Sequence, residues 1–279
     1  MTYFKQTALL VFFFSITLSA QKKNIFHNRD FWKTNPTIET IDKKIAEGNN
    51  ASELNNNAFD GVVYAILEKT DNETIKYLLS KKGNDVNKKT HDGRTYLFWA
   101  AYKNNLELMK YVVSKGAKTT FVDTHGNTFL NFAAASGQTD VALYAYSFKI
   151  GAAITKEKNY DGANALLLVA PYLKNYQLID LFLSEGAALT DTDSHGNGFF
   201  EYAAKGGNIP FLKTLIAKGI DTGKNAMIFA SAGLRRKKNT LETYKFLESV
   251  GIKVNIIDKT GKNPLHAIAY NSTDLATYT

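Results

Sequence analysis

The five histidines of this sequence are its first candidates for metal binding or acid–base chemistry, because imidazole titrates near neutral pH and coordinates metals. His91, His125 and His195 each stand one or two residues before a glycine that recurs along the chain. Metal ligands must converge within about 2.0–2.3 Å of one ion, whereas packed helices lie about 8–10 Å apart. His125 and His195 are two recurring units apart and therefore cannot share an ion. We expect these histidines to bond the backbone of their own turns.

Aspartates recur at the same turns, at Asp92, Asp123, Asp161, Asp193, Asp221 and Asp258. A calcium site needs several oxygen ligands within about 2.3–2.6 Å, and one carboxylate per turn does not supply them. Short acidic side chains at turns ordinarily accept hydrogen bonds from backbone N–H groups two residues on. We therefore expect these carboxylates to stabilise turns, and we predict no metal site.

The sequence has no constellation that argues for catalysis. It contains no cysteine, which excludes disulfides, thiolate metal sites and cysteine nucleophiles. It also lacks G-x-S-x-G, P-loop and G-x-G-x-x-G motifs, and no close pair of carboxylates suggests acid–base work. We predict a protein that is not an enzyme and has no cofactor.

Composition and net charge exclude few classes of function. The chain is 44% hydrophobic and 22% charged, which is typical of a folded protein. Its formal net charge is +8, and removing residues 1–20 with their single lysine leaves 33 − 26 = +7. A moderately basic surface suits an acidic protein, an anionic polysaccharide or a nucleic acid, and charge alone does not choose among them.

The stretch 196–221 shows which elements must position any functional side chain. Its first helical segment has Phe199 and Phe200 followed by the paired alanines 203–204, which leave room for close helix packing. Gly206 and Gly207 are expected to break this helix. A second segment has apolar residues at helical spacing, and Gly219 follows it where a left-handed residue usually ends a helix.

This stretch recurs along the chain. The helix-terminating glycines are 32 to 35 residues apart, at Gly48, Gly83, Gly116, Gly151, Gly186, Gly219 and Gly251. A second series of glycines precedes each unit, at Gly93, Gly126, Gly162, Gly196 and Gly261. Such a period with one turn and two helices per unit predicts a solenoid, which grows by stacking.

The repeated unit resembles the ankyrin repeat, whose turn motif is T-P-L-H-x-A. The best copy here is 263–269 (NPLHAIA), and weaker copies are 95–101, 128–134, 164–170 and 198–204. The resemblance covers about 29–279. It implies an all-α ankyrin-repeat solenoid of stacked helix–turn–helix units joined by β-turn loops.

The chain divides into three parts. Residues 1–20 are predicted to be a cleaved signal peptide, because a lysine precedes an apolar run of about 11 residues, too short to span a bilayer. We therefore expect an exported protein, periplasmic or secreted, without stable membrane insertion. Residues 21–28 are expected to form a flexible lead, a segment of little order before the first repeat. Residues 29–279 form about seven to eight units, of which the first is degenerate and the last incomplete, so we expect further repeats or a pairing chain beyond Thr279.

The ankyrin resemblance implies a concave groove that binds a protein partner, possibly an acidic one, rather than nucleic acid. By position, the groove includes turn-tip residues Phe121, Asp123, His125, Tyr160, Asp161, Asp191, Asp193 and His195. Inner-helix residues that follow the paired alanines add Tyr102, Lys103 and Lys205. The inserted basic run of Arg235, Arg236, Lys237 and Lys238 is either a solvated loop tip or a docking patch.

Two alternatives remain open from the sequence, one for the aromatic residues and one for the function. The aromatic residues Tyr96, Phe98, Phe129 and Phe199 are expected to pack between turns, or else to be exposed as contact anchors. The protein could instead be a structural or polysaccharide-associated component of the cell envelope, held there by its basic charge.

Gly219 is expected to need a positive φ, whereas Gly233, at the start of an insertion, is expected to tolerate substitution.

Overall fold

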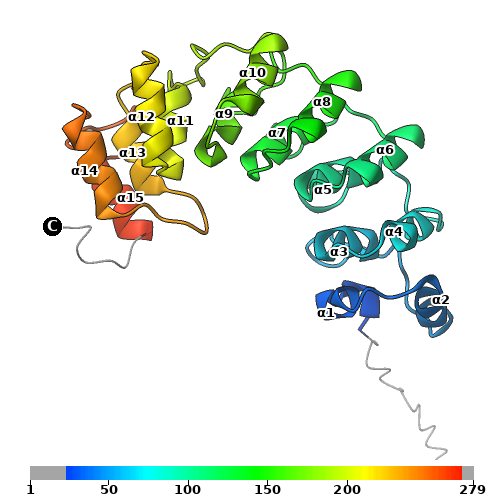
Figure 1. The fold of residues 1–279 in the computed structure, drawn as a ribbon. Helices are drawn as coiled ribbons and strands as arrows, with labels where there is room; N and C mark the ends of the chain where they lie inside the picture. Colours follow the sequence, from blue (N-terminus) through cyan, green and yellow to red (C-terminus); the bar gives the residue numbers. More distant parts are fainter. Residues whose placement is uncertain (1–22, 272–279) are drawn as a thin grey trace, which may run out of the picture.

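The computed structural model describes residues 23–271, which form a curved array of antiparallel helix pairs (Figure 1). The expected signal peptide at 1–20 and the incomplete end of the last unit lie outside the described residues. The described part contains no β-strand, only one isolated antiparallel bridge between Leu234 and Lys237. None of its helices has the length and apolar character needed to cross a membrane.

Each repeated unit pairs one inner helix, on the concave side of the arc, with one outer helix (Figure 1). The inner helices of units 1 to 8 are α1 (Arg29–Lys33), α3 (Gly61–Glu68), α5 (Tyr96–Tyr102), α7 (Phe129–Ala135), α9 (Ala165–Val169), α11 (Phe199–Gly206), α13 (Ala226–Ala232) and α15 (Pro264–Asn271). The outer helices of units 1 to 7 are α2 (Ile38–Ala46), α4 (Asn72–Leu79), α6 (Leu106–Ser114), α8 (Val141–Lys149), α10 (Gln177–Ser184), α12 (Ile209–Ala217) and α14 (Leu241–Ser249). Short 3-10 helices are η1 (Ile25–His27), η2 (His91–Gly93) and η3 (Ala170–Tyr172), and η3 contains Pro171, which cannot continue the α-helix of unit 5.

Helix termini in the array follow from local chemistry. The inner helices begin after a capping side chain in several units: Thr128, Asn164 and Asn263 each accept a hydrogen bond from the backbone N–H three residues on. All seven terminating glycines have positive φ, between +73° and +99°, which confirms their role at helix ends. The glycines that precede the units also have positive φ.

The turns are joined to one another by backbone hydrogen bonds. Backbone N–H groups of His91, Thr124, Tyr160 and Ser194 each donate to a carbonyl of the preceding turn, at 2.8 to 3.1 Å. The expected turn role of the aspartates is also present, because Asp123 and Asp193 accept from the backbone N–H groups two and four residues on. The turn-position aromatics Tyr96, Phe98, Phe129 and Phe199 are fully buried, so they pack between units and are not exposed anchors.

One feature near the N-terminus differs from the sequence-based expectations. Residues 23–28 are not a loose lead: Phe26 is fully buried, and its carbonyl accepts a hydrogen bond from Trp32 Nε1 (2.9 Å). Gly206 and Gly207 end their helix as expected, since Gly206 is the last residue of α11 and Gly207 is its left-handed C-cap, with a φ of +61°. Gly206 also permits close packing between units, because a Cβ there would be only 1.8 Å from Pro171 O.

Gly233 was also misjudged. Its φ of +60° and ψ of −170° lie in a region that side chains other than glycine's rarely adopt. Gly198 is the better control for a backbone test, because its φ is −103° and an added Cβ would meet no atom closer than 3.9 Å.

We predict that Gly219→Val lowers the free energy of unfolding by about 1–3 kcal/mol, because valine is strained at a φ of +73°. Gly198→Val, in extended backbone, should cost much less. Urea unfolding midpoints of the two variants measure the difference. Equal midpoints would show that the terminating glycines are not required for their conformation.

The position that histidine occupies in the T-P-L-H motif is filled differently from unit to unit. In unit 6 it is Glu201, whose buried carboxylate accepts from Gly198 N (2.5 Å) and from Asn225 N of unit 7 (2.7 Å). Burial raises the pKa of Glu201, and the backbone donors oppose that rise. In unit 4 it is Asn131, which is fully buried and whose two amide atoms have no hydrogen-bond partner.

We therefore expect opposite results from one substitution at this position. Asn131→Leu should raise the free energy of unfolding by about 1–3 kcal/mol, because it removes two buried polar atoms without partners, and Leu167 occupies this place in unit 5. Glu201→Leu should lower it by about 1–3 kcal/mol, because two backbone donors lose their acceptor. Urea denaturation monitored by circular dichroism tests both, and destabilisation by Asn131→Leu would contradict the first.

Candidate binding surface

A row of large apolar side chains runs along the inner helices. Each lies four residues after the N-cap residue of its helix, and the row, which we call the concave row, comprises Tyr64, Trp99, Phe132, Leu168, Tyr202 and Phe229. All are partly buried except Trp99, which is 4% exposed. The opposite sides of these helices are packed in the core, so the row occupies the open side of six consecutive units.

Aromatic contacts connect the row across units 2 to 4. The rings of Trp99 and Phe132 meet edge to face, with centroids 5.7 Å apart. Tyr102, one turn beyond Trp99, stacks on Phe132 at 5.4 Å. Phe59 extends the cluster into unit 2, stacking on Tyr64 at 5.4 Å and on the His91 ring at 4.4 Å. Such ring pairs contribute about 0.5–1.5 kcal/mol beyond area burial, so the surface is held rigid before any partner arrives.

Arg94 joins this cluster to the turn tips. Its guanidinium lies 4.0 Å from the Phe132 ring centroid and donates to Asp123 Oδ2 (Nη2 at 2.9 Å). Its other terminal nitrogen is 3.1 Å from Asp92 Oδ2. The arginine is almost fully buried, so this pairing is part of the fold.

The turn-tip residues expected in the groove fall into two classes. Asp123 and Asp193 are only 2% and 7% exposed, and their carboxylates hold turns together. Asp191 accepts from Asn164 Nδ2 (2.8 Å) and from Ala188 N (3.0 Å), so it too is engaged. The remaining tips are accessible, with Phe121 half-buried and with His125, Tyr160, Asp161 and His195 exposed.

The histidines of neighbouring turns come closer than sequence reasoning expected. Nε2 of His91 is 3.5 Å from Asp92 Oδ2, and Nε2 of His125 is 3.8 Å from the same oxygen. Arg94 already occupies that carboxylate, which disfavours a second cation. Within residues 23–271 no cluster of histidine and acidic side chains has the arrangement of a metal site. His91 does not bond the backbone of its own turn as expected, because its Nδ1 lies 2.9 Å from Asn57 O of the preceding turn.

Tyr102, Lys103 and Lys205, expected from the inner helices, lie at the carboxyl ends of those helices and are all partly buried. Tyr102 and Lys103 line a cavity of about 440 Å³ together with Lys69, Asn104, Ser136 and Gln138. Gln138 Nε2 donates to Tyr102 O (2.6 Å) and ties unit 4 to unit 3 there.

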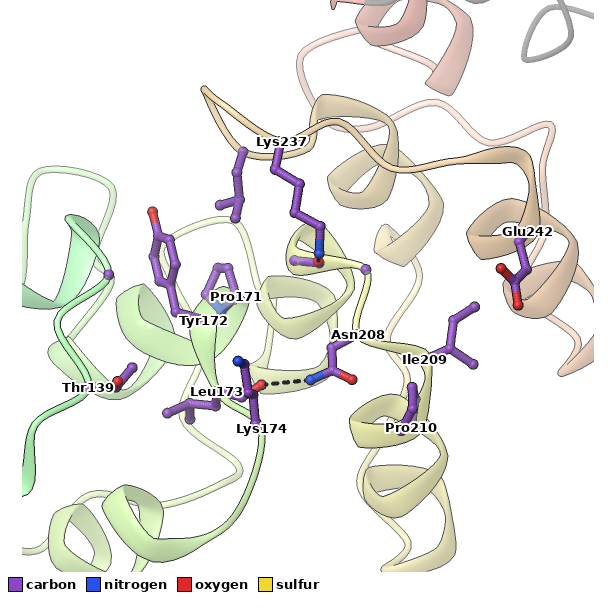
Figure 2. Close-up of a pocket in the computed structure, with 14 residues that line it drawn as sticks. Thr139, Pro171, Tyr172, Leu173, Lys174, Asn208, Ile209, Pro210, Lys237 and Glu242 are labelled. Carbon is purple, nitrogen blue, oxygen red and sulfur yellow. Dashed lines mark hydrogen bonds between the residues drawn. The ribbon is translucent and has the colours of Figure 1, made fainter.

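A larger cleft of about 870 Å³ continues along the same edge from unit 4 to unit 7 (Figure 2). Its lining includes Tyr172, Lys174, Gly206 and Lys237. Asn208 Nδ2 donates to Leu173 O (3.3 Å) and links the unit 5 and unit 6 sides of the cleft. Lys237 reaches across it to donate to Gly206 O (3.1 Å).

The basic run is divided between structural and exposed side chains. Lys237 and Lys238 donate to the carbonyls of Gly206 and Ala232 near the ends of α11 and α13. Arg235 and Arg236 are exposed. Neither of the two expectations, a solvated tip or a docking patch, describes all four residues.

Sequence reasoning missed the concave row, Phe59 and Arg94. The row had a signal in the sequence, since a large apolar residue recurs four positions after each helix cap. The contacts of Phe59 with His91 and Trp99 and the ion pair of Arg94 with Asp123 had no signal in the sequence, because each joins residues of different units.

Comparisons with known proteins address the fold. Residues 62–156 match the family model for ankyrin repeats, described as three copies. One chain of a solved complex, between the predatory endopeptidase Bd0816 of Bdellovibrio bacteriovorus and the immunity protein Bd3460, is similar in structure. The TM-score is 0.54 at 20% identity, over 68% of this chain and 96% of that one. The search of curated protein sequences gave no match.

The similarity to the solved complex supports the fold alone, because the identity is low, whereas the family match rests on the sequence of units 2 to 4. Units 1, 5, 6 and 7 have the same helix pair, the same terminating glycine and the same stacking of inner helices, and the inner helix of unit 8 stacks on that of unit 7. Residues 62–156 are therefore ankyrin repeats, and the rest of the described chain extends them into one ankyrin-repeat solenoid.

Proposed function

We propose that this chain is an exported, non-enzymatic scaffold that binds a partner protein on its concave face. The observation that carries the proposal is the concave row, in which large side chains stand in register on six consecutive inner helices and all but Trp99 remain partly open to solvent. Aromatic residues in such positions supply large contact area at little entropic cost, and they dominate binding energy at protein interfaces.

The rigidity of the array supports this function. Backbone hydrogen bonds join the turns, and ring contacts and Arg94 fix the row across units 2 to 4. A surface that is already ordered loses little side-chain entropy on binding, so more of the contact energy contributes to affinity. Ankyrin repeats are a protein-interaction scaffold in general, and the similar chain belongs to a complex of an endopeptidase with an immunity protein. Endopeptidases are therefore the first partners to test.

The alternative is a structural or polysaccharide-associated role in the cell envelope, favoured by the net charge of +8. The two functions differ in their response to salt. Binding through charge alone weakens steeply as ionic strength rises, whereas binding through the concave row should weaken less.

We predict that Phe132→Ala and Phe229→Ala each weaken capture of the partner at least about 10-fold, because a truncated aromatic anchor typically costs more than 1 kcal/mol. The assay is a crosslinking pull-down from the extracytoplasmic fraction, followed by titration of the captured protein. Tyr146→Ala, on the outer helix α8, is the matched control and should bind normally. Equal capture by all three variants, with unchanged thermal melting, would contradict a concave binding surface.

Export rests on the sequence of residues 1–20. We expect N-terminal sequencing of the mature protein to begin at Gln21 and fractionation to find it outside the cytoplasm. Phe12→Asp with Phe13→Asp should abolish export, because charges interrupt the apolar run. A mature protein that keeps Met1 in a membrane fraction would overturn this part of the proposal.

A further inference from the structure

Basic side chains gather at one edge of the concave face, where the inner helices end. Lys69 and Lys103 are the C-cap residues of α3 and α5, and Lys205 is in the last turn of α11. The loop after α13 adds its basic run to the same edge. We call this set the basic edge: Lys69, Lys103, Lys205, Arg235, Arg236, Lys237 and Lys238.

The loop after α13 is held over this edge by specific bonds. Asn239 Nδ2 lies within hydrogen-bond distance of Ala204 O, Lys205 O and Ala230 O, at 2.9 to 3.2 Å. Lys237 Nζ adds a bond to Gly206 O. Gly207 makes this approach possible, since a Cβ there would be 1.8 Å from Asn239 Oδ1. The loop is thus fixed, it extends into the concave side of the array (Figure 1), and it presents Arg235 and Arg236 to solvent.

Five of the seven positive charges of the basic edge are not balanced by a salt bridge within the described chain. No salt bridge of residues 23–271 involves Lys69, Lys103, Lys205, Arg235 or Arg236. Burial lowers the pKa of Lys103, and the charges of Lys69, Arg29 and Arg236 lower it further. Burial and the charge of Lys238 likewise lower the pKa of Lys205. Cations from units 2, 3 and 7 therefore repel one another across this face.

The acidic groups that face the basic edge do not cancel this charge. Glu68, beside Lys103, is paired with Arg29. Asp161 raises the pKa of Lys205 but ranks behind burial and Lys238 among the causes. The carboxylates of Asp92 and Asp123 are occupied by Arg94 at the opposite, turn-tip edge. A bound anion at the basic edge would relieve this repulsion.

We propose that the basic edge binds an acidic segment of the partner protein, whose apolar side chains lie on the neighbouring concave row. The proposal rests on the proposed function and adds the chemistry of the bound segment. The adjacent apolar row distinguishes the occupant: a peptide with acidic and apolar side chains contacts both surfaces, whereas a polyanion such as heparin or polyglutamate has no apolar side chains to place on the row. The clefts of about 440 and 870 Å³ along this edge give acidic side chains room to enter between units.

The test uses the full mature chain and four probes: a 12-residue fluorescent peptide of glutamate, leucine and phenylalanine, its counterpart with lysine for glutamate, a 12-residue polyglutamate, and heparin. We expect the acidic apolar peptide to bind most tightly. Lys103→Glu with Arg236→Glu should weaken it about 10-fold or more at low salt, with a smaller difference at high salt. The control is Lys149→Glu with Lys245→Glu, which makes the same charge change on exposed residues of the outer helices α8 and α14.

Thermal melting of each variant excludes misfolding as the cause. Equal binding of the acidic and lysine peptides, or equal weakening by the two double variants, would overturn the proposal. Heparin or polyglutamate binding as tightly as the acidic apolar peptide, without sensitivity to Phe132→Ala, would identify a general polyanion site instead. If Phe132→Ala abolishes partner capture and charge reversal has no effect, the proposed function holds and only this inference fails.

Discussion

The close stacking of inner helices is the constraint on which the rest of this structure depends. A helix pair of this size cannot bury its apolar faces alone, so each unit is stable only against its neighbours. Small residues permit the approach: Ala100, Ala101, Ala133 and Ala134 are fully buried, and Gly206 leaves room for the carbonyl of Pro171. The same stacking sets the spacing of the concave row and brings the helix ends together at one edge.

Buried polar groups make this stacking specific to particular neighbours. Asp60 of unit 2 is fully buried and accepts from Val63 N (2.9 Å), Tyr96 Oη (2.7 Å) and Lys88 Nζ (2.7 Å), so one carboxylate caps a helix and joins two units. Glu201 does the same between units 6 and 7. Removing one partner from such a group leaves a buried charge or donor unsatisfied, which penalises any other register of stacking.

The concave face therefore consists of three parallel zones with different roles. The turn tips use most of their carboxylates internally, the concave row supplies apolar area, and five cations of the basic edge form no salt bridge within residues 23–271. The two edges of the concave face therefore differ in charge, with the apolar row between them. A partner segment with one apolar side and one acidic side can bind in only one orientation. The arrangement of charges therefore contributes to the specificity of binding more than to its affinity.

The sequence by itself determined the period, the helix pairs and the glycines that end them, because these follow from local helical spacing and from φ values that favour glycine. It also favoured packing of the turn-position aromatics between units and a turn role for the aspartates, which the buried aromatic rings and the contacts of Asp123 and Asp193 confirm. Only the tertiary structure decided the order in residues 23–28 and the close approach of Gly206 to Pro171 and of Gly207 to Asn239, since each depends on atoms distant in sequence. The effect of the Arg236 charge on the pKa of Lys103 likewise depends on the curvature of the array, because the two residues belong to units 7 and 3. Curvature accumulates from small rotations between units, and no local pattern in the sequence encodes it.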